Sequence, residues 1–242
     1  MARGRGTERQ RTYNREASRL SASPQRSHRA SGLTHSVIKV ANPKPKYASV
    51  GLRAKTGRAI AVALSGPPDS PRVIRRTELR LTDPSQPATS QPYHEVMDLR
   101  WGEAKVEVRK ISAIVEDMAS KALAGLVQEI EAEGFTVRGI GIVGAGNRDL
   151  EKIGSTHIRA HAAEGVLFRQ VLEVAAGRNK QNHRAFDERL LDEIAGNELK
   201  RPSADIKNHL AEMGRSAGSP WRADEKAAAL AAWLALAGRA KK

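Results

Sequence analysis

The chain has 242 residues, which is enough for one domain with a hydrophobic core or for two small domains. It contains no cysteine, which excludes disulfide scaffolds, thiolate nucleophiles and cysteine-ligated zinc. The net charge of +14 is concentrated near the N-terminus: residues 1–46 carry 11 Lys and Arg against two Glu, whereas the rest carries 30 basic and 25 acidic residues. Attraction to phosphates or acidic surfaces is therefore expected mainly in that segment.

We predict that residues 1–45 form a disordered basic tail, because few large apolar side chains interrupt their Arg, Ser and Gln. Such a tail can bind nucleic acid without sequence preference, and the alternative is a solubilising leader.

The N-terminus has no apolar signal region, and no run approaches the roughly 18 apolar residues of a membrane span. We expect a soluble, cytoplasmic protein with no membrane contact, while its oligomeric state is not predicted.

The folded domain is expected over residues 46–240 and begins with short β-type runs. A hairpin is predicted from 47–53 and 58–65, joined by an Ala-Lys-Thr-Gly turn, and a third strand from 72–82. Residues 83–100 contain three prolines and are expected to form a loop that crosses one end of this antiparallel meander.

Helical spacing of apolar residues predicts a long helix over 103–133, which Gly134 would end. The Val- and Ile-rich run 135–143 then predicts a strand, followed by a Gly-Ala-Gly-Asn loop. Four further helices are expected at 156–176, 185–195, 203–213 and 223–237, with Ser203 as a cap and Gly177, Gly196, Gly214 and Gly238 as stops. This order predicts an α/β domain with a mixed sheet, and a helix that crosses over onto it.

This element order resembles the ribonuclease H-like fold, and within it the Holliday-junction-resolvase branch. Two local segments carry the resemblance: Val50-Gly51-Leu52-Arg53, where such proteins have a first-strand motif ending in Asp, and 224–231, which is similar to their terminal helix. The chain is also similar to bacterial proteins with His-Ala-Ala-Glu-Gly (161–165) and Pro-Trp-Arg-x-Asp-Glu-Lys (220–226) segments, a likeness that implies no activity.

The resemblance implies a nuclease site that this sequence lacks. Arg53 stands where the metal-binding aspartate is expected, and Val143 or Gly144 stands where an acidic residue usually ends the fourth strand. Two-metal phosphodiester chemistry needs several carboxylates that converge on ions roughly 3.5–4 Å apart. We therefore expect a protein that binds nucleic acid or nucleotides and lacks the standard nuclease carboxylates.

Three polar residues share one face of the helix predicted at 156–176, namely His157, His161 and Glu164. Two His and a carboxylate can bind a transition-metal ion, but a zincin helix places Glu directly after its first His, where this chain has Ile158. We assign no metal ligands here, and the sequence identifies no cofactor. A solvated polar face, an anion site that includes Arg159, and a small-molecule or metal-dependent enzyme remain alternatives.

A second polar group begins the helix at 223–237. Asp224 and Glu225 would be favoured there by the helix dipole alone. The resemblance also implies that Asp224 could share a cleft with Glu164, while Arg222 and Lys226 set their charge. We therefore predict His161, Glu164 and Asp224 as catalytic candidates and His157, Arg159, Arg222 and Lys226 as anion contacts. A structural or interaction protein without catalysis is the competing class.

Overall fold

The computed structural model describes residues 45–238. These residues belong to one compact unit. The predicted basic tail at 1–45 therefore lies almost wholly outside the described residues. Between residues 45 and 238, no helix combines the length and the apolar character that a membrane crossing needs.

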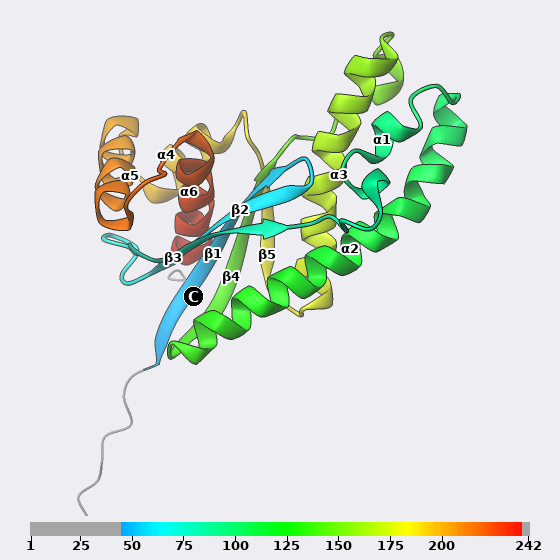
Figure 1. The fold of residues 1–242 in the computed structure, drawn as a ribbon. Coiled ribbons are helices and arrows are strands. Elements are labelled where there is room, and N and C mark those ends of the chain that lie inside the picture. Colours follow the sequence, from blue (N-terminus) through cyan, green and yellow to red (C-terminus); the bar gives the residue numbers. More distant parts are fainter. Residues whose placement is uncertain (1–44, 239–242) are drawn as a thin grey trace, which may run out of the picture. The chain divides into compact units, whose positions relative to one another are not determined.

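The centre of the domain is a five-stranded mixed sheet in the order β3-β2-β1-β4-β5 (Figure 1). The strands are β1 (Lys46–Lys55), β2 (Arg58–Ser65), β3 (Arg72–Arg80), β4 (Phe135–Gly144) and β5 (His183–Asp187). β1, β2 and β3 pair as an antiparallel meander, and β4 and β5 run parallel to β1. The antiparallel meander followed by helix crossovers confirms the predicted α/β class with a mixed sheet.

Helices cover both faces of this sheet. α2 (Trp101–Ala132) and α3 (Thr156–Arg178) lie on one face, while α4 (Leu191–Leu199), α5 (Ser203–Ala217) and α6 (Ala223–Ala237) lie on the other (Figure 1). Successive side chains of β1 point to opposite faces of the sheet, so each face contacts a different set of helices. Val50 and Leu52 join the core that α2 and α3 complete, whereas Ser49 donates to the backbone oxygen of Ala232 on α6.

Short helical turns occur at three places between the main elements: η1 (Pro87–Thr89), α1 (Pro92–Glu95) and η2 (Leu150–Lys152). The first two lie in the segment 83–100, predicted as a loop. The contacts of α1 place it against α3 and α2. α1 therefore lies near the start of α3, which carries the two predicted histidines.

α6 packs closely on the sheet because two strand residues have no side chain. A Cβ atom on Gly51 would lie 1.7 Å from the backbone oxygen of Ala228, and one on Gly141 would lie 2.2 Å from that of Ala231. Both distances are far shorter than any contact between non-bonded atoms. Glycine is therefore required at Gly51 and Gly141 for this helix position.

Several predicted boundaries are wrong. The helix expected at 185–195 is replaced by β5 followed by α4, because residues 183–187 pair with β4 at the edge of the sheet. Gly177, Gly196 and Gly214 lie inside helices, and Ser203 makes no cap because Pro202 occupies the N-cap position. These helices extend past single glycines because burial of their apolar faces stabilises them. A glycine inside a helix lowers its stability by only about 1 kcal/mol relative to alanine.

Candidate functional site

His157 and His161 lie one turn apart at the start of α3. The side chain of Ser155 caps this helix by accepting from the backbone nitrogen of Ile158, which fixes where the first turn begins. Both imidazoles are exposed, and their Nε2 atoms lie 3.1 Å apart. The i, i+4 spacing thus brings two ring nitrogens together, as the sequence predicts.

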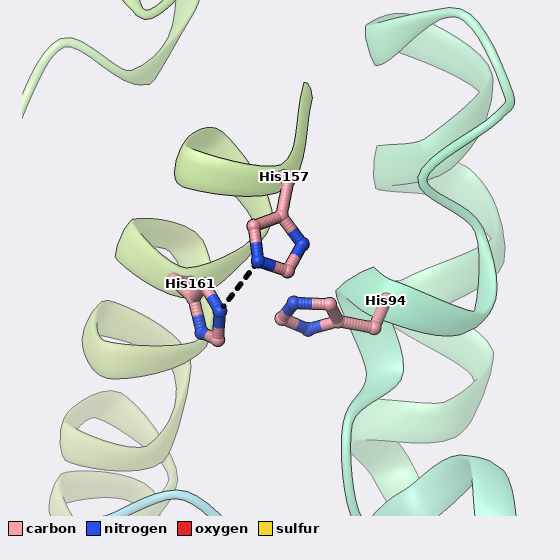
Figure 2. A group of neighbouring side chains, drawn as sticks. All are labelled: His94, His157 and His161. Atoms are coloured by element: carbon pink, nitrogen blue, oxygen red, sulfur yellow. Dashed lines mark hydrogen bonds between the residues drawn. The ribbon is translucent and has the colours of Figure 1, made fainter. Parts of the chain in front are cut away.

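A third imidazole approaches this pair from another element. His94 on α1 directs its ring toward His157 and His161, with ring centroids 5.2 Å and 4.4 Å away (Figure 2). One ligand nitrogen from each ring lies within 4.8 Å of the other two. We call His94, His157, His161 and their neighbour Glu164 the histidine site.

Glu164 is the buried member of the histidine site and is fully inaccessible to solvent. Its Oε1 lies 2.8 Å from Nδ1 of His94 and also accepts from the backbone nitrogen of His94 at 3.3 Å. Because a carboxylate only accepts, the shared hydrogen is assigned to Nδ1 of His94. Glu164 therefore orients His94 so that its Nε2 faces the other two imidazoles.

The remaining candidates on α3 and α6 have other partners. The guanidinium of Arg159 lies 5.3 Å from the ring of Trp101, which stacks on Tyr93. The Glu225 side chain accepts from the backbone nitrogen of Arg222, so Glu225 serves the helix start. Lys226 is exposed one residue later. The predicted anion contacts thus fall into two separate groups, one on each face of the sheet.

Asp224 belongs to an ion cluster at the end of β1. It accepts from Nε of Arg53 at 3.4 Å and pairs with Nζ of Lys55 at 3.3 Å, while Arg53 also pairs with Glu188. We call Arg53, Lys55, Glu188 and Asp224 the sheet-end ion cluster. It lies on the face that α6 covers, because Arg53 follows Ser49 and Gly51 on the same side of β1.

The structure does not form the cleft expected between Glu164 and Asp224. α3 and α6 cover opposite faces of the sheet, so the sheet separates the two carboxylates (Figure 1). Each has its own positively charged or hydrogen-bonding partners, His94 for Glu164 and Arg53 with Lys55 for Asp224. His161 and Glu164 remain together in the histidine site, and Asp224 does not join them.

The sheet-end ion cluster does not fit a pair of hard metal ions. Arg53 pairs in register with Val143, and Val143 with Phe186, so β1, β4 and β5 offer one cation and two apolar side chains at this level. The side chain of Arg53 occupies the space between Asp224 and Glu188. A guanidinium in contact with both carboxylates takes up the negative charge that Mg²⁺ would need.

Sequence reasoning missed three contributors, His94, Lys55 and Glu188. His94 lies in a proline-containing segment with no periodicity, so only the fold brings it to α3. Glu188 falls in the helix predicted at 185–195, whereas the structure places it in the turn directly after β5. The pairing of Arg53 with acidic residues could have been suspected, since a charged residue inside an apolar strand usually has a partner.

Comparison with solved structures finds similar chains. One is Thermus thermophilus RuvC in complex with Holliday junction substrate, with 9% identity and a TM-score of 0.45, covering 78% of this chain and 91% of that one. Another Thermus thermophilus RuvC structure has 10% identity and a TM-score of 0.40, with 77% and 92% covered. No protein-family model and no curated protein matches the sequence.

Proposed function

We propose that the protein binds nucleic acid and that its ribonuclease H-like domain does not cleave phosphodiester bonds by a two-metal mechanism. The observation that carries the second part is the position of Arg53 between Asp224 and Glu188. The guanidinium of Arg53 would have to leave both carboxylates before metal ions could bind there. The protein is therefore proposed to act by binding, which the basic tail supplies, instead of by this cleavage chemistry.

The binding part of the proposal rests on charge. Residues 1–46 carry a net charge of +9, and this excess of arginine can neutralise phosphates in any sequence context. Tyr13 is the only aromatic residue in that segment, so stacking on unpaired bases contributes little. Binding should accordingly be strongly salt-dependent and weakly sensitive to sequence.

The test measures binding of a short DNA duplex, a single strand and a four-way junction by the full-length protein over a salt series. Replacing four tail arginines (Arg3, Arg5, Arg9 and Arg11) by Gln should flatten the plot of log affinity against log salt. The expected change is up to about 0.9 in slope for each phosphate contact that is lost on duplex DNA.

A control variant removes the same number of positive charges from exposed positions of the folded domain, namely Arg72, Arg80, Arg109 and Arg189. Its slope should stay close to that of the unmodified protein. If the control weakens binding and the tail variant does not, the contact lies on the domain and the role given to the tail is wrong. Absence of salt-dependent binding by the unmodified protein would favour an interaction protein that has no nucleic-acid ligand.

A further inference from the structure

We infer that the histidine site binds one divalent transition-metal ion of the zinc class through Nε2 of His94, His157 and His161. Ligand nitrogens about 2.0–2.1 Å from a tetrahedral zinc ion lie roughly 3.3–3.4 Å from one another. The Nε2 atoms of His157 and His161 lie 3.1 Å apart, and His94 completes a set whose ligand atoms are all within 4.8 Å. The rings of His157 and His161 are exposed, so they have room to adjust their positions around an ion.

Two buried polar atoms in this site support the inference. Nε2 of His94 and Oε2 of Glu164 make no hydrogen bond with any residue in the described part of the chain. An unpaired buried polar atom costs about 1–3 kcal/mol, so native structures rarely retain one without a reason. For His94, a metal ion at the centre of the three rings supplies the partner that Nε2 lacks.

The contact between Glu164 and His94 is the one that metal-binding histidines commonly make. A carboxylate that accepts from Nδ1–H leaves the Nε2 lone pair free, fixes the ring orientation and makes the nitrogen more basic. Glu164 Oε1 lies 2.8 Å from Nδ1 of His94, and the backbone nitrogen of His94 also points at this oxygen. Glu164 is thus a positioning residue that acts through His94.

The charge and ligand type define the class of ion. A fully buried carboxylate such as Glu164 needs a nearby positive charge, and a divalent ion held by its histidine partner supplies one. Three imidazoles suit zinc and related transition metals, whereas Mg²⁺ and Ca²⁺ prefer oxygen ligands. Three protein ligands would leave the fourth position of a tetrahedral ion to water, on the side where His157 and His161 are exposed.

The site is independent of the proposed nucleic-acid contact, because it lies on α1 and α3 and needs no residue of the basic tail. Its failure and the failure of that proposal are therefore distinguishable. The test uses full-length protein without a histidine tag, stripped of metal and titrated with Zn²⁺ by calorimetry. Co²⁺ serves as a second probe, because its visible absorption reports a tetrahedral nitrogen site.

We expect one Zn²⁺ per chain and a tetrahedral Co²⁺ spectrum. His157→Asn and His161→Asn should each weaken Zn²⁺ binding by at least about tenfold, and Glu164→Gln, which keeps an acceptor for His94, by about 10–100-fold. His157 and His161 are exposed, so their substitution should leave thermal unfolding of the metal-free protein unchanged. His183→Asn is the matched control, because His183 is an exposed histidine on β5.

Three results would overturn the inference. The first is the absence of stoichiometric Zn²⁺ binding by the unmodified protein. The second is unchanged affinity in both His157→Asn and His161→Asn. The third is an equal loss of affinity in His183→Asn, which would show that surface histidines bind the ion without a defined site.

Discussion

At the scale of single residues, Arg53 determines which chemistry the end of the sheet can perform. Its guanidinium contacts Asp224 and Glu188, and the side chain is only 16% exposed. Removing either carboxylate would leave a half-buried cation with fewer partners, so the cluster is held together as a unit. The same two carboxylates are thereby kept from binding a metal ion.

Asp83 provides a pH-dependent contribution in the segment that leads to His94. The hydroxyl and the backbone nitrogen of Ser85 both donate to its carboxylate, and these hydrogen bonds lower the pKa of Asp83 below its ordinary value. A carboxyl group whose pKa is lower in the folded state stabilises the protein above the unfolded-state pKa. That contribution is lost as the pH falls through the folded-state pKa.

We therefore predict that Asp83→Asn lowers the free energy of unfolding at neutral pH and that the difference disappears on acidification. Urea unfolding of both proteins over a pH series measures this effect. Asp98→Asn, at an exposed position of the same segment, is the control and should change the free energy of unfolding at neutral pH by less than about 0.5 kcal/mol. A difference for Asp83→Asn that grows as the pH falls would contradict the account.

The sequence predicted part of the histidine site. It predicted the residues related by local helical spacing, and it missed the residue that only tertiary packing brings near. His157, His161 and Glu164 follow from helical spacing alone, because i, i+4 and i+7 share a face. His94 follows from no local pattern, since its approach depends on how α1 packs against α3. Without the third imidazole, the pair looks like an exposed polar face and no metal ligand is assigned.

At the scale of elements, the close contact between α6 and the sheet depends on two glycines. α6 is buried along most of its length, and Trp233 within it is fully inaccessible and donates to the backbone oxygen of Pro68. Gly51 and Gly141 provide the space for its backbone. The position of Asp224, one turn away from this contact, follows from that packing.

We predict that Gly51→Ala lowers the free energy of unfolding by about 3 kcal/mol or more, because the added methyl group has no space against Ala228. Gly125→Ala is the matched control on α2, where an added Cβ would meet nothing within 4 Å. It should stabilise by up to about 1 kcal/mol through helix propensity. Equal unfolding free energies for the two variants in urea would show that α6 does not pack as described.

Prediction of the elements succeeded where a segment carries its own periodicity. The 32 residues of α2 repeat apolar side chains at helical spacing, and the strands of the meander are short β-type runs separated by turn residues. β5 was missed because its five residues form a strand only by pairing with β4. Neighbouring strands, and not local sequence, supply the hydrogen bonds that define such a short edge strand.

At the scale of the whole domain, the sheet separates two polar groups that the sequence interpretation combines in one cleft. The histidine site lies with α1 and α3, and the sheet-end ion cluster lies beneath α6 (Figure 1). The two groups of side chains do not contact each other, so a substitution in one leaves the contacts of the other in place. The metal binding proposed for the first and the lack of two-metal cleavage proposed for the second can therefore be tested separately.

The most direct measurement of the central claim is a cleavage assay on DNA that the protein binds. Full-length protein is incubated with labelled duplex and four-way junction in Mg²⁺ or Mn²⁺ under salt conditions where binding is saturated. We predict bound but intact DNA in both metals, because Arg53 holds Asp224 and Glu188. Cleavage that requires Mg²⁺ or Mn²⁺ and is lost in Asp224→Asn would contradict this account.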